Sequence, residues 1–241
     1  MVLVVGECDP RDSAVHGVLE LIEGLRPRSI GIGTGSTVGR VISDPRVSSI
    51  LSKAMLVSSS LDTLLKLNSM GFTVLDQRSV PHVDVYIDGA DEVDRNGDMV
   101  KGRGGALLGE KVLAYNSMVN VFVVGEDKLV DRLGSKKPVP VEVVPEYLTH
   151  VLESLTAIGL RHRVRSGTGK DGPVLSDWRG VIVDLDTGPI KDPYRLELTL
   201  KSIPGIVETG LFLGYADYIV VGYRDCTWRI NRYERRRRWN I

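Results

Sequence analysis

The feature that most constrains the fold is an alternation of short apolar runs with helical patterns in the first half of the chain. The apolar runs are rich in Val, Ile and Leu, and they occupy Ser29–Ile32, Ala54–Val57, Phe72–Leu75, Val83–Ile87 and Val119–Val124. Helical periodicity separates several of them, as at Leu61–Met70 and Gly105–Tyr115. Strands that alternate with helices predict a parallel sheet covered on both faces, and therefore an α/β fold.

The first helix is expected to start at Asp12 or Ser13, either of which could cap it. Its apolar face would consist of Val15, Val18, Leu19, Ile22 and Leu25. A second helix should follow the first strand and run to Ile42.

The pattern changes after Gly134. A strand at Val139–Val144, a helix at Glu146–Ile158, strands at Leu160–Val164, near Val174 and at Val181–Leu185, a helix at Pro193–Ser202 and a strand at Gly205–Leu211 follow in turn. This order is that of a split βαβ, ferredoxin-like unit. We expect a Rossmann-like domain (1–134), an inserted smaller α+β domain (135–211), and a segment (212–241) in which Asp217–Gly222 returns to the first sheet as a strand.

Polar residues gather where the predicted strands end. Thr34–Thr37, Ser58–Ser60 and Asp88–Asp91 each follow an apolar run directly. In an open parallel sheet, ligands bind in the crevice beyond the carboxyl ends of the strands. The sequence therefore predicts a binding site at this edge of the sheet.

The stretch DGADEVDRNGDMVKGRGGALLGE, residues 88–110, has the groups needed for proton transfer. Asp88 and Asp91 follow a strand, Lys101 precedes a glycine-rich turn, and Glu110 lies in the helix beyond it. Carboxylates and a lysine beside flexible backbone suit acid–base chemistry on a small anionic substrate. A solvated acidic turn next to a glycine hinge is the structural alternative.

The turn GIGTGST, residues 31–37, is not a dinucleotide-binding fingerprint. That motif needs a glycine where Ser36 stands, and the second strand ends in three serines rather than an acidic residue. No GxxxxGK[ST] motif occurs either. Glycine backbone, two hydroxyls and a helix N-terminus suit a phosphate monoester, although a purely structural turn has the same composition.

A metal site is not expected. The segment beginning at Glu92 resembles a calcium loop, but its first position is Glu rather than Asp and its twelfth is Arg103 rather than Glu. Asp88 and Asp91 could bind a divalent ion, yet Lys101 could supply the positive charge instead.

Composition excludes several other classes. The formal net charge is zero, so no overall field favours nucleic acid or a membrane surface. No apolar stretch is long enough to span a bilayer, and the opening residues lack a signal-peptide pattern. The two cysteines, Cys8 and Cys226, form no metal-ligand or disulfide-framework pattern, which fits a reducing cytoplasm. The arginine cluster Arg235–Arg238 is expected to be a solvated tail.

Several motifs in order resemble the type A family of ribose-5-phosphate isomerases. These are GIGTGST, IDGADEVD, KGRGGALLGEK, DKLVD, KPVPVEVVP, IPGIVETGLF and ADYIVVG, which together span about Ala14 to Gly222. The resemblance implies interconversion of D-ribose 5-phosphate and D-ribulose 5-phosphate in the non-oxidative pentose phosphate pathway, without metal or cofactor. It also implies a Rossmann-like domain with a smaller α+β lobe, and a homodimer or homotetramer.

The resemblance also implies roles for individual residues. Glu110 would be the base that moves a proton between C2 and C1 through an enediol or enediolate, Asp88 and Asp91 would handle hydroxyl protons, and Lys101 would stabilise the oxyanion. The remaining substrate-binding residues would be Thr34, Gly35, Ser36, Thr37, Gly89, Ala90, Gly102, Arg103, Gly104 and Lys128. Many members have a phosphate-binding lysine in the first helix, where this chain has Arg11-Asp12-Ser13-Ala14. Arg11 could replace that lysine, although its guanidinium differs in reach and geometry.

Two other functions are compatible with the predicted fold. A sugar-phosphate sensor would need the phosphate turn but would have no use for Asp88, Asp91, Lys101 and Glu110 together. An acyl- or CoA-transferase could use a similar scaffold. An assay of ribose 5-phosphate isomerisation with and without EDTA separates the three.

Overall fold

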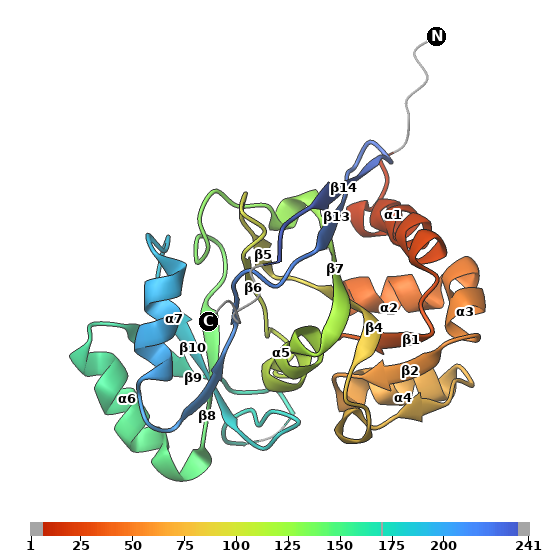
Figure 1. Ribbon diagram of the computed structural model, residues 1–241. Coiled ribbons are helices and arrows are strands. Elements are labelled where there is room, and N and C mark those ends of the chain that lie inside the picture. The colour runs from red at the N-terminus through yellow and green to blue at the C-terminus, as the bar shows by residue number, and fades with distance from the viewer. Residues whose placement is uncertain (1–6, 170, 236–241) are drawn as a thin grey trace. The chain divides into compact units, whose positions relative to one another are not determined.

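The computed structural model describes residues 7–169 and 171–235 (Figure 1). The chain divides into two compact units. Unit 1 consists of Met1–Gly89, Leu113–Leu129 and Tyr215–Ile241, and unit 2 of Ala90–Val112 and Val130–Gly214. The stretch Ala90–Val112, which contains Lys101 and Glu110, therefore belongs to the same unit as the α+β lobe.

Unit 1 is built on a seven-stranded sheet in the order β14-β13-β7-β4-β1-β2-β3. All neighbouring pairs are parallel except β13 with β14. The strands are β1 (Ser29–Ile32), β2 (Met55–Ser58), β3 (Val74–Leu75), β4 (Val83–Gly89), β7 (Ser117–Gly125), β13 (Tyr218–Gly222) and β14 (Trp228–Arg232). The predicted α/β class and the return of the 217–222 segment to the first sheet are confirmed.

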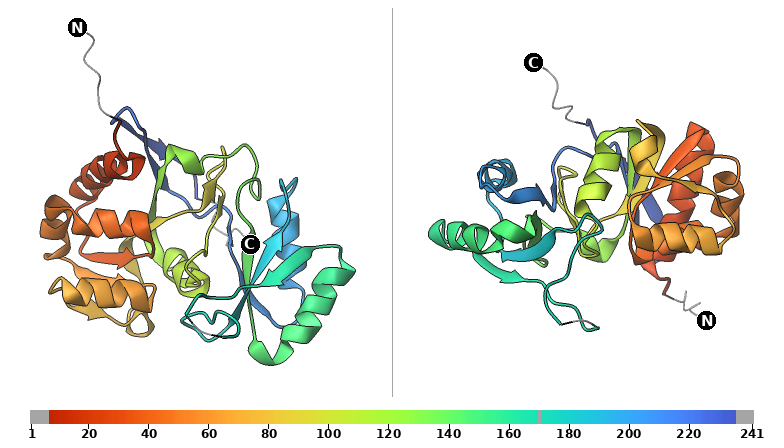
Figure 2. Two further views of the ribbon diagram at one scale, coloured as in Figure 1. Left: turned by 180° about the vertical axis from the view of Figure 1, so that it is seen from behind. Right: turned by 90° about the horizontal axis from the view of Figure 1, so that it is seen from below.

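Four helices flank this sheet, and Figure 2 shows them in red and orange around the strands of unit 1. They are α1 (Pro10–Leu25), α2 (Ser36–Ser43), α3 (Pro45–Leu51) and α4 (Leu61–Ser69), with short 3₁₀ turns η1 (Gln77–Ser79) and η2 (Glu126–Lys128) after β3 and β7. Alternate strand residues such as Ile30, Ile32 and Ile87 are buried in one core with Val18 of α1 and Val41 of α2.

The expected start of α1 is wrong by several residues. Asp9 is the N-cap, its side chain accepts a hydrogen bond from the backbone N–H of Arg11, and Pro10 occupies the first helical position. Asp44 and Pro45 start α3 in the same way. Proline at the first position is favourable because the N–H that it lacks would have no helical acceptor there.

The main part of unit 2 is a four-stranded antiparallel sheet in the order β11-β8-β10-β9, made of β8 (Val139–Val143), β9 (Arg161–Val164), β10 (Val181–Asp186) and β11 (Ile206–Thr209). Helices α6 (Leu148–Ala157) and α7 (Pro193–Lys201) lie on one face of it (Figures 1 and 2), and η3 (Pro145–Tyr147) precedes α6. The chain order β-α-β-β-α-β is the predicted one. The expected strand near Val174 is limited to isolated bridges, Ser166 with Pro173 and Leu175 with Val181.

A second, three-stranded sheet in unit 2 has the order β12-β6-β5, from β5 (Glu92–Val93), β6 (Met99–Val100) and β12 (Leu211–Phe212). Helix α5 (Leu107–Tyr115) begins in unit 2 and ends in unit 1. The chain immediately after β6 and the start of α5 contain Lys101 and Glu110, so these elements determine where the two side chains lie.

Two expectations for the chain ends need correction. Cys8 and Cys226 form a disulfide, with Cα atoms 5.2 Å apart, that joins the segment before α1 to the β13–β14 hairpin. The expected solvated tail is wrong for Arg235, the first residue of the arginine cluster, which follows β14 and contacts unit 1. Arg235 then donates hydrogen bonds to the carbonyls of Ala114 and Ser117, each at 2.6 Å. Arg236, Arg237 and Arg238 lie outside the described residues.

Candidate active site

The predicted phosphate turn joins β1 to α2 in unit 1. Gly35 is the N-cap of α2 and has a φ of +111°, a left-handed conformation that favours glycine. The first turn of a helix has N–H groups without intrahelical acceptors, and Ser36 and Thr37 add hydroxyls there. Thr34 donates a 2.5 Å hydrogen bond to Ser60, so the turn is tied to the serines at the end of β2.

Asp88, near the end of β4, is buried beside this turn. Its carboxylate accepts hydrogen bonds from the backbone N–H of Thr34 at 3.1 Å and of Gly89 at 2.7 Å, and from the Tyr86 hydroxyl at 2.6 Å. A Cβ on Gly33 would lie 2.0 Å from the Asp88 carboxyl carbon, so only glycine permits this approach. The convergence of the turn, the serines and Asp88 at one sheet edge is therefore present in unit 1.

The two cations considered for the phosphate, Arg11 and Lys128, also belong to unit 1. The Arg11 guanidinium donates two hydrogen bonds to the Asp9 carboxylate, with N–O distances of 2.6 and 2.9 Å. This hydrogen bonding lowers the pKa of the Asp9 carboxyl to about 2. Arg40 of α2 also pairs with Asp9, at 2.9 Å. Lys128 lies in η2 after β7, 3.3 Å from Asp127. Arg11 is thus held by Asp9, the residue that caps its own helix.

Lys101 and Glu110 form a buried ion pair in unit 2. The Lys101 ammonium lies 3.3 Å from a Glu110 carboxylate oxygen, and both side chains are only 4% exposed. The ammonium also lies over the Phe212 ring, 5.3 Å from its centroid. The backbone of Lys101 is fixed because its N–H donates to the Gly210 carbonyl at 2.8 Å. A carboxylate and an ammonium are therefore held next to each other with little contact with bulk water.

Asp91 and the glycine-rich turn lie in the same unit. The Asp91 carboxylate accepts a 3.1 Å hydrogen bond from the backbone N–H of Arg103, while the Arg103 side chain is largely exposed. Gly102 and Gly105 have φ values of +102° and +76°. Gly102 also has little space, since a Cβ there would lie 2.9 Å from Pro140. Ala90 and Gly104 complete the predicted residues of this segment.

A second buried lysine lies beside this pair and was not anticipated from the sequence. The Lys111 ammonium is 2.8 Å from Glu208, 3.4 Å from Glu197 and 3.3 Å from the Thr209 hydroxyl. It lies 5.0 Å from the centroid of the same Phe212 ring. Burial alone would raise the pKa of the Glu208 carboxyl, but the Lys111 ammonium outweighs it and the pKa is lowered. We call these residues the Lys111 cluster.

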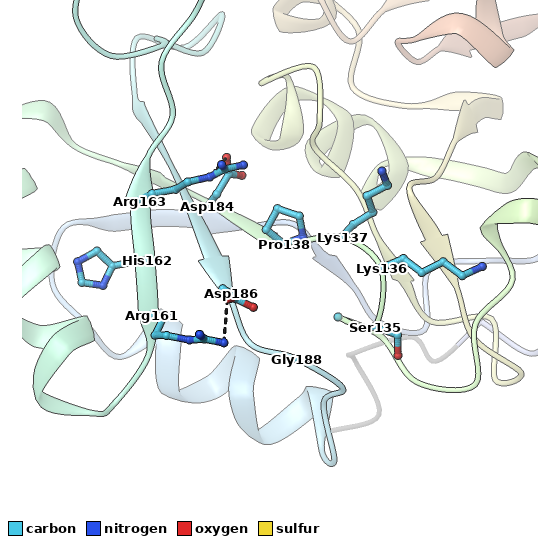
Figure 3. Close-up of a pocket in the computed structure, with 11 residues that line it drawn as sticks. Ser135, Lys136, Lys137, Pro138, Arg161, His162, Arg163, Asp184, Asp186 and Gly188 are labelled. Carbon is cyan, nitrogen blue, oxygen red and sulfur yellow. Dashed lines mark ion pairs between the residues drawn. The ribbon is translucent and has the colours of Figure 1, made fainter.

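Unit 2 also has a cavity of about 450 Å³ at the β9–β10 edge (Figure 3). None of the predicted site residues lines it. Its lining is rich in cations, with Lys136, Lys137, Arg161 and Arg163 against the two carboxylates of Asp184 and Asp186. Arg161 pairs with Asp186 at 2.9 Å, and Arg163 lies 3.8 Å from Asp184.

Over the ranges 7–169 and 171–235, no group of three or more His, Cys, Asp or Glu side chains is arranged to hold a metal ion. In the same part of the chain, no helix has the length and apolar character needed to cross a bilayer.

The chain is similar to known proteins over most of its length. The family model for ribose 5-phosphate isomerase A (phosphoriboisomerase A) matches residues 55–226. The ribose-5-phosphate isomerase A of Aeropyrum pernix is 51% identical over 229 residues, which cover 94% of this chain and 96% of that protein. The corresponding protein of Pyrococcus abyssi is 38% identical over 81% of this chain and 87% of its own length.

Solved structures give the same result. A D-ribose-5-phosphate isomerase in complex with phospho-erythronic acid has a TM-score of 0.85 at 35% identity, covering 92% of this chain and 97% of that one. Ribose 5-phosphate isomerase A from Methanocaldococcus jannaschii has a TM-score of 0.84 at 30% identity, covering 93% and 98%. The chain belongs to the ribose 5-phosphate isomerase A family, and it is an enzyme of the aldose–ketose isomerase class.

Proposed function

We propose that this enzyme interconverts D-ribose 5-phosphate and D-ribulose 5-phosphate by proton transfer through an enediolate, as a step of the non-oxidative pentose phosphate pathway. The observation that carries the proposal is the buried Lys101–Glu110 pair. Glu110 takes the proton from C2 of the aldose and delivers it to C1. Lys101 stabilises the negative charge that develops on the enediolate oxygens, where a preorganised cation is most effective.

Asp88 and Asp91 handle the hydroxyl protons and assist opening of the furanose ring. Three donors hold the Asp88 carboxylate in one orientation, and the Arg103 N–H holds that of Asp91. A base whose orientation is fixed before substrate arrives loses less entropy in the transition state. Gly89, Ala90, Gly102, Arg103 and Gly104 provide backbone that can approach the sugar closely.

The phosphate binds at the N-terminus of α2, where Gly35, Ser36 and Thr37 offer N–H groups and hydroxyls, with Thr34 preceding them. Lys128 supplies a cation. Arg11 can contribute only if it leaves Asp9. The phospho-erythronic acid of the related structure is a sugar-phosphate analogue, which supports a substrate of this size and charge.

Further parts of the proposal concern the cellular setting. We infer that the enzyme acts as a homodimer or homotetramer in the cytoplasm, without a metal or organic cofactor. A disulfide is ordinarily a feature of oxidising compartments, but intracellular proteins of hyperthermophilic archaea are a documented exception.

A coupled assay of ribose 5-phosphate conversion, run with and without EDTA, tests the proposal. The expected result is turnover that EDTA leaves unchanged. Loss of activity in EDTA, restored by a divalent cation, would overturn the metal-free mechanism. Binding of ribose 5-phosphate without turnover would support a sensor instead.

A further inference from the structure

Arg165 connects the α+β lobe of unit 2 to the turn that separates Lys101 from Glu110. Its guanidinium donates from one nitrogen to the carbonyl of Gly102 at 2.9 Å and to the carbonyl of Arg103 at 2.8 Å. Arg165 follows β9 directly, and its side chain is 17% exposed. No motif in the sequence marks this residue, which is more than sixty positions from the turn that it contacts.

The other side of the guanidinium is fixed by Asp184 of β10. Nε donates to Asp184 at 3.0 Å and Nη2 donates to the second carboxylate oxygen, so the contact is bidentate. Asp184 is only 4% exposed. A planar guanidinium can form this fork and hold two carbonyls at once, which an ammonium cannot do.

The two carbonyl contacts determine where the neighbouring N–H groups point. In a trans peptide the carbonyl and the following N–H point in opposite directions, and no cis peptide occurs in the described part of the chain. The Gly102 carbonyl faces Arg165, so the N–H of Arg103 faces away from it, and this is the N–H that donates to Asp91. The Arg103 carbonyl also faces Arg165, so the N–H of Gly104 faces away in turn.

This restraint matters because the turn contains Gly102, Gly104 and Gly105, and glycine backbone samples many conformations when nothing holds it. We propose that Arg165, held by Asp184, is a positioning residue for catalysis: it fixes the Gly102–Gly104 peptides in the orientation that aims the Arg103 N–H at Asp91. It does not touch the substrate. The inference rests on the proposed function, because it assumes that Asp91 and this turn act on the sugar.

Arg165→Lys tests the inference most directly. Lysine can still pair with Asp184 but cannot hold both carbonyls, so the melting temperature should change little. We expect kcat for ribose 5-phosphate to fall roughly 10- to 100-fold, because small misplacements of catalytic groups have effects of this size, while KM changes less than about threefold. A wild-type kcat in Arg165→Lys would overturn the inference.

Arg163→Lys is the matched control. Arg163 lies in β9, two residues before Arg165, and its Nε is 3.8 Å from the same Asp184 carboxylate. Figure 3 shows the two side chains next to each other. Arg163 is 77% exposed and forms no described bond to the turn. Its kcat and KM should equal those of the wild type. An equal fall of kcat in both variants would mean that the effect does not depend on the two carbonyl contacts of Arg165, and would also overturn the inference.

Asp184→Asn provides a second route if Arg165→Lys does not fold. It leaves Arg165 in place but removes the charge that orients it, and we expect kcat to fall about 10-fold with KM nearly unchanged. A wild-type kcat in this variant would count against positioning through Asp184. Glu110→Gln is measured alongside. If Glu110→Gln is as active as the wild type, the proposed function fails; if it is inactive and Arg165→Lys is normal, only this inference fails.

Discussion

Two buried lysines of unit 2 lie against the same aromatic ring. The Lys101 ammonium, which pairs with Glu110, lies 5.3 Å from the Phe212 centroid. The Lys111 ammonium, which pairs with Glu197 and Glu208, lies 5.0 Å from the same centroid. Glu110 and Lys111 are even consecutive residues of α5, separated by about 100° around the helix. By burial and charge alone, either cluster could be taken for a catalytic centre.

The difference lies in what surrounds each ammonium. Lys111 has two carboxylates and a hydroxyl around it, drawn from α7 and β11, and it joins these elements to α5. Lys101 and Glu110 instead flank the glycine turn that contacts Asp91. Perturbed charges in a protein interior include structural ion pairs as well as catalytic groups, so the surroundings decide the interpretation. We assign the Lys111 cluster to stability and the Lys101–Glu110 pair to chemistry.

Exchanging one carboxylate in each cluster should separate the two roles most clearly. Glu110→Gln should lower kcat by roughly 10²- to 10⁴-fold with little change in melting temperature, because it removes the proposed general base but keeps the shape of the side chain. Glu208→Gln is the matched change, and it should keep kcat while lowering stability. Steady-state kinetics and thermal unfolding of both variants measure this. If Glu208→Gln lost as much turnover as Glu110→Gln, the division of roles would fail.

Removing the second ammonium should have a large effect on stability. Lys111→Met removes the buried cation that contacts both Glu197 and Glu208, and it leaves Glu208 with the partly exposed Lys201 at 3.3 Å. Breaking a buried ion pair in this way costs roughly 3–5 kcal/mol of unfolding free energy. Urea unfolding measures the loss, and the folded fraction should retain the wild-type kcat. A Lys111→Met protein as stable as the wild type would show that the cluster contributes nothing.

The same cluster should also contribute to acid sensitivity. The pKa of Glu208 is lower in the folded protein than its ordinary value of 4.5, so the carboxylate adds stability that is fully present above pH 4.5. That contribution is lost as the pH falls through the lowered pKa. Glu208→Gln should therefore flatten the stability profile below pH 4.5, as measured by unfolding at a series of pH values. If Glu208→Gln lost as much stability below pH 4.5 as the wild type does, the proposed role of the ion pair would be contradicted.

Substitution of Glu142 should have the smallest effect on stability, and its pH dependence should be opposite to that of Glu208. Glu142 is buried in β8, where it accepts a hydrogen bond from Ser176, and its Oε2 atom has no hydrogen-bond partner among residues 7–169 and 171–235. Burial raises the pKa of this carboxyl, so its contribution is fully present below pH 4.5 and is lost as the pH rises through the folded pKa. We expect Glu142→Gln to stabilise the protein slightly at pH 7 and to have little effect below pH 4.5. Destabilisation at pH 7 would show that the charge is needed.

Much of the fold could be predicted because the buried strands are nearly continuous apolar runs, as at Val83–Ile87 and Val119–Val124. The small sheet β5–β6–β12 was missed because its strands have two residues each, too few to show a period. The Asp9-Pro10 and Asp44-Pro45 pairs were usable signals for the starts of α1 and α3. The disulfide gave no signal, since its cysteines are 218 positions apart.

The catalytic candidates lay in one stretch, residues 88–110, and motif order identified them. Their supporting residues could not be found in this way. Arg165 reaches the glycine turn only through the pairing of β9 with β10, and the partners of Lys111 come from α7 and β11. Contacts of this kind depend on tertiary packing and leave no local pattern in the chain.

Solvent exchange at the substrate carbons tests the central claim most directly. Ribose 5-phosphate is incubated in D₂O with the wild type and with Glu110→Gln, and deuterium at C2 of the aldose and C1 of the ketose is followed by NMR over many turnovers. Proton transfer through Glu110 predicts deuterium at both carbons with the wild type, and exchange slower by roughly 10²-fold or more with the variant. Exchange and turnover by Glu110→Gln at the wild-type rates would contradict the account.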